Sequence, residues 1–413
     1  MKIALLTQYY KPEMGAPQNR LYEMIHGLKE CGNEVCIITG MPNYPMGKIF
    51  DDYRGKITCT DQIDGVEIKR YWLYASNTKK VIPRIWNMVS FSFMVLFSLR
   101  YLKSKQLDYL IVESPPLTLG LVGKWLAKHA HCKFIANISD IWPLSAKELG
   151  AISEGKLYHI LENLEHRIYK GAYISMGQSQ EIVDHIASHG GNKTYLFRNG
   201  VDPTRFADIK VHKINDGKVR LVYAGLLGFA QGVADICKSI NFAEMGMEFH
   251  IYGSGGEQKE IEAFIASHPN NGIIYHGVVA REELPFRLKE ADMTLIPLVK
   301  NIYGAVPSKI YDSMAAALPI MFVGEGEGAR IVKDNNIGLV AHSKDYEGLK
   351  DNIKYAVSHP EEMKVMAKNC VDCAENKFNR PKQILCLNDY LKDNLKSVSY
   401  THLRAHETTL HLV

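Results

Sequence analysis

Short runs of β-branched and other apolar residues alternate with longer segments of helical apolar spacing along almost the whole chain. In the first half these runs predict strands at residues 2–7, 34–39, 108–112, 133–138, 172–176 and 194–197. In the second half they predict strands at residues 219–224, 248–252, 273–276, 293–296, 320–323 and 338–340. Strands that alternate with helices are typical of parallel sheets with helices on both faces, so the predicted class is α/β.

The length of the chain predicts more than one domain, because 413 residues with 46% hydrophobic content exceed one domain of ordinary size. The stretch Asn199–Asp216 begins with turn residues, ends with polar residues and precedes a fresh strand, so it is interpreted as an interdomain linker. The architecture predicted is two Rossmann-like domains in tandem. Such folds bind ligands at the carboxyl ends of their strands.

Charge is concentrated in the first half, where residues 1–200 carry 24 lysines and arginines against 18 aspartates and glutamates. We therefore expect this half to meet an anionic surface. The eight cysteines lie in apolar segments with no secretory signal before them, which favours reduced thiols in a cytoplasm. The single pair Cys370 and Cys373 lies on a helical pattern and is interpreted as structural, not as a metal site.

One segment departs from the α/β pattern: residues 85–99, IWNMVSFSFMVLFSL, are apolar on nearly all sides. Its flanking cations are Lys79, Lys80, Arg84, Arg100, Lys103 and Lys105. A membrane-spanning helix needs about 20 apolar residues, and this segment has fewer. The alternatives are a buried helix of the first domain or an interfacial helix that lies in an anionic cytoplasmic leaflet. The basic excess favours the interfacial helix.

The C-terminal stretch Val398–Thr408, VSYTHLRAHET, resembles the in-frame translation of a sequencing adapter. We expect residues 398–413 to be a non-native tail and the native chain to have continued beyond Ser397. The three histidines of this tail are therefore not considered as metal ligands.

In the first half, Gly15, Ala16 and Pro17 follow the first strand and open a helix that runs to about Lys29. Small residues at a helix start let backbone N–H groups approach a phosphate or a sugar. Many α/β domains carry such a loop for packing alone. It is not a GxGxxG motif, and no acidic residue after the second strand takes the ribose-binding part, which disfavours a nicotinamide enzyme.

Asp140 lies just past the strand predicted at 133–138. A carboxylate there could stabilise positive charge developing on a sugar ring or accept a proton from an acceptor hydroxyl. The alternative is that Asp140 caps the turn while Trp142 packs behind it. The position at a strand end favours a functional role.

Three glycine-rich turns follow three successive strands of the second half: Gly225, Gly228 and Gly232; Gly253, Gly255 and Gly256; and Gly277 with Val278. Each turn alone could be a tight connection to a helix. Together they predict a backbone-lined cleft for a nucleotide diphosphate, with Gln231 able to offer an amide.

The strongest local signal is the segment 296–324, IPLVKNIYGAVPSKIYDSMAAALPIMFVG. Gly304 precedes Pro307 and Ser308, which suit the first turn of a helix able to bind a diphosphate. Lys309 within that turn opposes the helix dipole unless an anion is bound nearby. Asp312, one turn on, could accept hydrogen bonds from ribose or sugar hydroxyls, or be a solvated helix carboxylate.

Six motifs resemble glycosyltransferase family 4 and, within it, the WbuB-type enzymes of bacterial surface-polysaccharide assembly. They are GAPQNR (15–20), SDIWPLSA (139–146), RNGVD (198–202), YAGLLGFAQG (223–232), YGSGGE (252–257) and VPSKIYDSMAAALPI (306–320), in the family's order. The resemblance covers Met1–Leu395. It implies a GT-B fold, retention of anomeric configuration, no cofactor and no catalytic metal, and the chain has no DxD motif.

The resemblance also implies a division of the chain and a set of contacts. The domains would be 1–203 for the acceptor, 204–380 for the donor, and a helix over 381–397 that returns to the first domain. The nucleotide would contact Gly253 and the Gly277–Val278 turn. The diphosphate would meet Gly225, Gln231, Lys309 and the helix start at Gly304, while Gly15, Ala16 and Arg20 would form an acceptor or phosphate loop.

Two departures from the family pattern concern the donor site. Many members carry two glutamates with seven residues between them, where this chain has Gly304 and Asp312. Many also carry an arginine and a lysine in the first donor loop, where this chain has Leu226 and Gln231. Lys309 is the residue we expect to supply the missing cation.

The expected activity is transfer of a sugar from a nucleotide-sugar, expected to be a UDP-sugar, to a polyprenyl-diphosphate-linked saccharide. The enzyme would be cytoplasmic and peripheral at an anionic membrane surface, with no nucleic acid partner, and Asp140 would position the acceptor or stabilise charge. A sugar-nucleotide epimerase of the same fold and a catalytically inactive nucleotide-sugar-binding scaffold are the alternatives.

Overall fold

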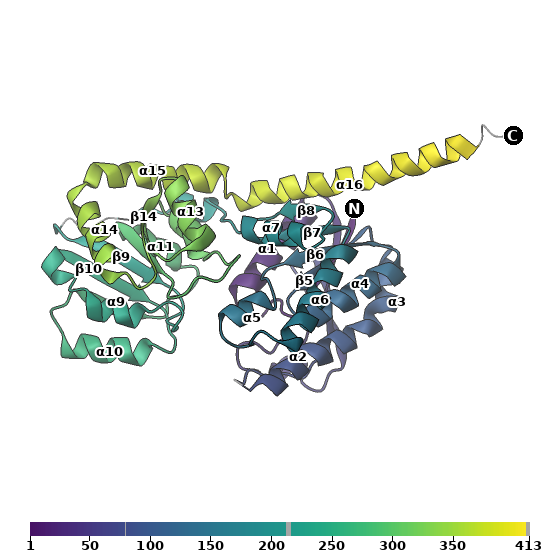
Figure 1. Ribbon diagram of the computed structural model, residues 1–413, viewed down its shortest axis with the longest axis horizontal. Coiled ribbons are helices and arrows are strands. Elements are labelled where there is room, and N and C mark those ends of the chain that lie inside the picture. The colour runs from purple at the N-terminus through teal and green to yellow at the C-terminus, as the bar shows by residue number, and fades with distance from the viewer. Residues whose placement is uncertain (79, 212–215, 410–413) are drawn as a thin grey trace. The chain divides into compact units, whose positions relative to one another are not determined.

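The chain folds into two compact units, seen in a computed structural model that describes residues 1–78, 80–211 and 216–409 (Figure 1). Unit 1 comprises Met1–Arg198 together with the chain from Pro381 onward, and unit 2 comprises Asn199–Arg380. The sequence placed the first boundary five residues later, after residue 203.

Unit 1 is built on an eight-stranded sheet in the order β3-β4-β2-β1-β5-β6-β7-β8. The strands are β1 (Lys2–Leu6), β2 (Glu34–Gly40), β3 (Thr58–Ile63), β4 (Val66–Tyr71), β5 (Tyr109–Ser114), β6 (Lys133–Ile138), β7 (Ile174–Gly177) and β8 (Thr194–Leu196). The helices are α1 (Ala16–Glu30), α2 (Val81–Met94), α3 (Leu99–Lys105), α4 (Leu117–Ala130), α5 (Leu144–Glu148), α6 (Lys156–Gly171), α7 (Gln180–Ser188) and α16 (Arg380–Thr409), with 3-10 turns η1 (Asp51–Tyr53) and η2 (Val95–Ser98). The central strands are buried on both faces, which is why they read as continuous apolar runs.

The hairpin of β3 and β4 was missed by the sequence analysis. The two strands pair antiparallel, so the sheet is not wholly parallel as expected. The turn is Asp64–Gly65, with φ of 47° and 71°. An Asp-Gly pair between two short strands is a strong hairpin signal because both residues tolerate positive φ, so the sequence did carry the information.

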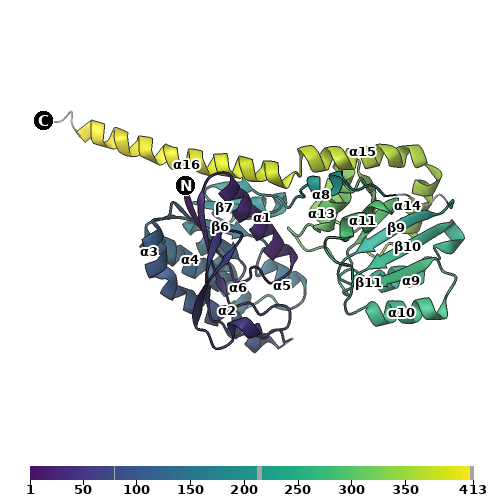
Figure 2. The ribbon, with the colours of Figure 1, turned by 180° about the vertical axis from the view of Figure 1, so that it is seen from behind.

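The last helix, α16, belongs to unit 1 (Figure 2). Ile384, Leu387 and Leu391 are buried in the core that also contains β1 and α1 residues. The hydroxyl of Tyr109 donates a hydrogen bond to the carbonyl of Leu391, over 2.9 Å. The helix continues to Thr409, past the segment 381–397 expected for it. Of the expected tail, residues 410–413 lie outside the described part of the chain.

Unit 2 contains a six-stranded, wholly parallel sheet in the order β11-β10-β9-β12-β13-β14. Its strands are β9 (Val219–Ala224), β10 (Met247–Tyr252), β11 (Ile273–Gly277), β12 (Met293–Pro297), β13 (Ile320–Val323) and β14 (Gly338–Ala341). Its helices are α8 (Thr204–Ala207), α9 (Val233–Ser239), α10 (Gln258–Ser267), α11 (Leu284–Lys289), α12 (Lys309–Ala315), α13 (Gly326–Asp334), α14 (Tyr346–Ser358) and α15 (Pro360–Asn376), with the 3-10 turn η3 (Ala243–Met245). Two separate apolar clusters pack on the two faces of this sheet, as expected for a doubly covered sheet.

Much of the expected linker is part of unit 2. Val201 forms a bridge with Asn379, and its amide donates to the carbonyl of Phe378 over 3.0 Å. Phe206 in α8 is buried in the core of the unit. This part of the stretch therefore packs against unit 2, where the turn residues suggested a linker. Residues 212–215 lie outside the described part of the chain.

We predict that Leu391→Ala lowers the free energy of unfolding of unit 1 by about 2–5 kcal/mol, because it leaves a cavity at a fully buried site. Leu385→Ala, on the same helix but exposed, should change stability little. Denaturant titration measures both. Equal effects of the two substitutions would contradict the packing of α16 described here.

Candidate functional site

The loop after β1 in unit 1 has the helix start predicted from the sequence. α1 begins at Ala16, and Gly15 is its N-cap. Glu13, ahead of this glycine, is buried, and its carboxylate accepts hydrogen bonds from the amides of Asn43 and Tyr44, over 2.7 and 2.8 Å. Burial raises the pKa of Glu13 to about 7. Glu13, which the sequence analysis did not single out, fastens this loop to the one after β2.

Arg20 makes buried contacts that the sequence did not suggest. Its guanidinium is 5% exposed; Nη2 donates to Glu113 Oε1 over 2.5 Å and Nη1 to Gln178 Oε1 over 3.1 Å. Glu113 also accepts from Asn137. Arg20 thus joins the carboxyl ends of β5, β6 and β7 in a buried polar cluster, and its terminal nitrogens are committed within the protein. A buried ion pair of this kind is costly to break, and the predicted phosphate contact of Arg20 stays a prediction.

Asp140 lies after β6, as predicted, at the carboxyl edge of the unit 1 sheet. Its Oδ2 accepts a hydrogen bond from the hydroxyl of Ser145 over 3.0 Å. Burial is the main cause that raises the pKa of Asp140 to about 6, and the charges of Glu148 and Glu165 add to it. A carboxylate with a raised pKa, half-buried at a strand end, is suited to proton transfer or charge stabilisation.

In unit 2, the ammonium group of Lys309 lies over the turn that follows β9. Nζ donates to the hydroxyl of Tyr223 over 2.7 Å and lies 4.0 Å from the centre of the Tyr223 ring. No carboxylate among the residues described in the structure forms an ion pair with Lys309. Burial without a counter-charge lowers the pKa of Lys309 to about 7. The side chain as a whole is only half-buried, so an anion can reach it from the carboxyl edge of the sheet.

Two glycines of the predicted cleft lie where neighbouring loops are in van der Waals contact, with no room for a side chain. A Cβ at Gly225 would lie 2.7 Å from Nζ of Lys309, and one at Gly253 would overlap the carbonyl of Gly225. Their φ angles, 146° and 135°, are ones that other residues rarely adopt. The amide of Gly225 donates to Tyr252 O over 2.9 Å and that of Gly253 to Gly277 O over 2.7 Å. These two amides are therefore not free for a phosphate, and the glycines act by leaving room.

The turn between β9 and α9 offers other donors and one acceptor. None of the described residues accepts a hydrogen bond from the amides of Leu226 and Gly228. Oε1 of Gln231 is buried and forms no hydrogen bond with any described residue. Polar groups left unpaired at the carboxyl edge of a parallel sheet suit a ligand that pairs with them.

The predicted helix start at Gly304 is wrong in position. Gly304 is buried with φ of 85°, in the loop between β12 and α12, and α12 begins only at Lys309. Ser308 is the N-cap residue and makes no side-chain capping bond. Gly304 itself cannot be part of the helix, because a helix does not accept its left-handed conformation.

Asp312 has a partner that the sequence did not suggest. Its Oδ1 lies 3.4 Å from Nη1 of Arg205, which comes from α8 in the expected linker. Both side chains are about one-third exposed, at 34% and 31%. Asp312 is thus accessible to a ligand hydroxyl, and its predicted contact with the donor stays a prediction.

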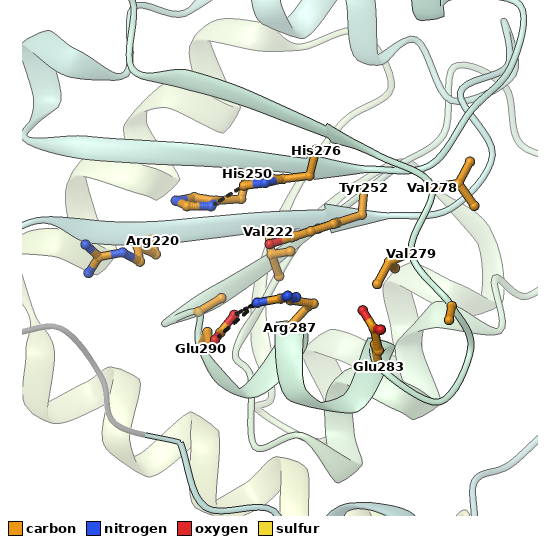
Figure 3. Close-up of a pocket in the computed structure, with 12 residues that line it drawn as sticks. Arg220, Val222, His250, Tyr252, His276, Val278, Val279, Glu283, Arg287 and Glu290 are labelled. Atoms are coloured by element: carbon orange, nitrogen blue, oxygen red, sulfur yellow. Dashed lines mark hydrogen bonds and ion pairs between the residues drawn. The ribbon is translucent and has the colours of Figure 1, made fainter.

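A groove of about 510 Å³ runs along one face of the sheet of unit 2 (Figure 3). Tyr252 and His276 stack with ring centres 4.4 Å apart, and His250 continues the stack. The wall opposite this stack is formed by α11. There Arg287 pairs with Glu290, over 3.2 Å. The groove begins at Val278, beside the turn that accepts the hydrogen bond from Gly253. Backbone contacts thus connect the groove through Gly277, Gly253 and Gly225 to Lys309.

Comparison with known proteins bears on both units. Residues 204–371 match the family described as Glycosyl transferases group 1.

This part of the chain is similar to group 1 glycosyl transferase domains.

Two curated relatives agree with the domain assignment. The chain is 22% identical over 333 residues to the colanic acid biosynthesis glycosyl transferase WcaI of Escherichia coli, covering 76% of this chain and 81% of WcaI. It is 24% identical over 278 residues to the glycosyltransferase WbjE of Pseudomonas aeruginosa, covering 64% of this chain and 69% of WbjE.

Solved structures show that the fold is GT-B. Sucrose-phosphate synthase from Thermosynechococcus elongatus superposes with a TM-score of 0.73 at 14% identity, over 96% of this chain and 99% of that one. Anabaena HepE, solved with UDP, gives a TM-score of 0.69 at 14% identity, over 96% and 100%. At such identities the likeness establishes the fold and not the substrate.

The sequence analysis missed several side chains around the predicted cleft of unit 2. Tyr223 lies within the YAGLLGFAQG motif. Its hydroxyl contact with Lys309 could not be predicted from the sequence, because the two residues are 86 positions apart. The aromatic stack of the groove combines β10 and β11, and nothing in either segment alone signals it. No group of three histidine, cysteine, aspartate or glutamate side chains within residues 1–78, 80–211 and 216–409 is placed to hold a metal ion.

We predict that Lys309→Met raises the melting temperature of the unliganded protein, because it removes an unpaired buried charge. The folded state favours the neutral amine, since the pKa of Lys309 falls from 10.5 to about 7. The destabilisation by Lys309 is therefore absent above about pH 10.5, grows as pH falls, and is complete below about pH 7. Scanning calorimetry near pH 7 and near pH 10 measures the change.

The exposed Lys333→Met serves as the matched control and should leave the melting temperature unchanged at both pH values. A Lys309→Met protein that melts lower than wild type near pH 7 would show that Lys309 has a stabilising partner.

Proposed function

We propose that the chain is a retaining, metal-independent glycosyltransferase of family 4, close to its WbuB-type enzymes. It transfers a sugar from a UDP-sugar to a polyprenyl-diphosphate-linked saccharide during surface-polysaccharide synthesis. The observation that carries the proposal is the unpaired Lys309 ammonium at the carboxyl edge of a group 1 glycosyl transferase domain. The names of WcaI and HepE, the latter solved with UDP, support the process and the donor.

The donor lies along the connected contacts of unit 2. The diphosphate binds against Lys309 and the amides of Leu226 and Gly228, and the nucleoside binds at the Val278 end of the groove. Lys309 then neutralises charge on the leaving diphosphate, which a metal ion does in other transferases. Binding an anion raises the pKa of Lys309 back toward its usual range, so donor binding and protonation of Lys309 favour each other.

Transfer with retention needs few acid–base groups from the protein. The bond between the sugar's anomeric carbon and the diphosphate oxygen breaks, and the acceptor hydroxyl oxygen bonds to that carbon on the same face. The acceptor's proton passes to the departing diphosphate. In unit 1, Asp140 holds the acceptor or stabilises positive charge on the sugar ring.

Incubation with a panel of nucleotide-sugars, with and without a lipid-linked acceptor and with EDTA, tests the activity. We expect product only when a UDP-sugar and the acceptor are both present, an unchanged rate in EDTA, and retained anomeric configuration by NMR. Product from a soluble UDP-sugar without acceptor would indicate an epimerase, and no product under any condition would indicate a scaffold.

In the same assay Gly225→Ala should raise the donor KM about tenfold or more, because its Cβ would displace the Lys309 ammonium. Gly246→Ala is the matched control: its φ is also positive, at 68°, but a Cβ there meets nothing within 4 Å. Both variants carry backbone strain, and only Gly225→Ala should lose donor affinity.

Asp140→Asn should lower kcat by more than tenfold, about 1.4 kcal/mol, if the carboxylate takes part in transfer. With the pKa of Asp140 at about 6, the wild-type rate should fall below that pH as the carboxylate is protonated, and the variant should lack this fall. A smaller loss with an unchanged pH profile would remove Asp140 from the mechanism.

A further inference from the structure

The surface of α2 and η2 in unit 1 carries a row of large apolar side chains that no other part of the described structure covers. We call Ile82, Ile85, Trp86, Phe93 and Phe97 the apolar ridge; they are 52% to 80% exposed. The rings of Phe93 and Phe97 pack edge to face, 5.8 Å apart. Both views place α2 along the outer surface of unit 1 (Figure 1, Figure 2). Side chains of this size are costly to leave in water over a continuous surface.

The polar side of α2 faces the interior. Asn87, Ser90 and Ser92 are buried. The hydroxyl of Ser90 accepts a hydrogen bond from the amide of Tyr74 over 2.9 Å, and that of Ser92 donates to Thr118 over 2.8 Å. Polar as well as apolar side chains of this segment thus face the interior, while large apolar side chains are left on its outer side. An outer side of this kind suits an apolar partner outside the unit.

The segment Ile82–Lys105 is long and apolar enough to cross a membrane, with a mean hydropathy of 1.4. Three features place it parallel to a bilayer instead. It is broken by the 3-10 turn of η2, its inner residues Phe91 and Val95 are fully buried in unit 1, and its buried serines and Asn87 bond to the body of the unit. Crossing would expose these polar groups to hydrocarbon.

Charge around the ridge selects an anionic surface. From residue 68 to residue 107 the sequence contains no aspartate or glutamate. The side chains of Lys80, Arg84, Arg100 and Lys103 are exposed at the two ends of the ridge. Two copies of such a face would repel one another, whereas anionic lipid headgroups attract each cation by about 1 kcal/mol. Aromatic and isoleucine side chains between cations are the composition of an interfacial helix.

We propose that the apolar ridge, with its flanking cations, seats unit 1 in the interface of an anionic lipid bilayer, with α2 in the membrane plane. This inference stands on the surface alone and does not need the proposed transferase activity. It combines the two alternatives left by the sequence: in this proposal the same helix is packed on its inner side and interfacial on its outer side.

The helix is also joined to the loop after β1. Oδ1 of Asn87 accepts hydrogen bonds from Nε2 of Gln8 over 2.6 Å and from the hydroxyl of Tyr9 over 3.1 Å, and Nδ2 donates to Tyr74 O. Gln8 and Tyr9 directly precede the loop that leads to Gly15. Seating of α2 therefore holds that loop at a fixed depth beside the lipid. If the proposed function holds, this is how a lipid-linked acceptor meets unit 1.

Co-sedimentation of the full chain with vesicles tests the proposal. We expect binding to vesicles of phosphatidylcholine mixed with phosphatidylglycerol, weakened by added salt, and much weaker binding to phosphatidylcholine alone. The double variant Trp86→Ser/Phe93→Ser should reduce the partition coefficient at least about tenfold. The double variant Arg100→Gln/Lys103→Gln should reduce binding to the anionic vesicles by about tenfold or more and leave binding to neutral vesicles unchanged.

Val365→Ser is the matched control, since it removes an apolar side chain of similar exposure, 53%, on α15 of unit 2. It should bind vesicles as wild type does. Retained binding by the Trp86→Ser/Phe93→Ser variant, or binding indifferent to lipid charge, would overturn the proposal. Circular dichroism, which reports the secondary structure of the whole chain, should match wild type in all variants. UDP affinity, which depends on unit 2 in the proposed function, should also match, so that misfolding is excluded as the cause.

Depth of insertion separates an interfacial helix from a spanning one. The fluorescence of Trp86 is obtained as the difference between wild type and Trp86→Phe. It should be quenched by lipids that carry a quencher near the headgroup, and little by lipids that carry it at the chain end. Stronger quenching at the chain end would contradict the proposal. Vesicle binding without any sugar transfer would refute the proposed function and leave this inference standing; transfer to a water-soluble acceptor without vesicle binding would do the reverse.

Discussion

The ammonium of Lys309 is held against Tyr223 and above Gly225 with no carboxylate beside it in the described structure, and much of unit 2 is arranged around that contact. Burial of a charge that is not paired costs free energy, and the cost appears here as a pKa lowered to about 7. A protein retains such a residue where a ligand supplies the missing charge. In the proposed reaction, the donor diphosphate takes this part.

Several features of unit 2 leave room around the ammonium group of Lys309. Gly225 and Gly253 leave no side chain between the turns, so the backbones after β9, β10 and β11 touch one another. Gly304 adopts a left-handed conformation, and α12 begins after it at Lys309, which places the lysine at the first helical position. A residue with a side chain would adopt the conformation of Gly304 only with strain.

The sequence predicted the elements better than the contacts between them. Twelve strands were expected and found because buried parallel strands are continuous apolar runs, while the β3–β4 hairpin lies at a sheet edge where that pattern is weak. Asp140 and the glycine turns could be placed because strand ends are set by local sequence. The Arg20–Glu113 pair and the Arg205–Asp312 pair could not, since each joins residues about 93 and 107 positions apart. The sequence also did not predict which side of this helix is exposed as the apolar ridge, because the segment is apolar on nearly all sides.

The most direct test of the central claim is the uptake of protons when UDP binds. Titration calorimetry at about pH 8, in buffers that differ in ionisation enthalpy, measures this number. With the pKa of Lys309 at about 7 in the free protein, most of the amine is neutral at that pH, and binding of the diphosphate should draw close to one proton per site. Lys309→Met should abolish the uptake. Equal uptake by wild type and Lys309→Met, or none by either, would contradict the account.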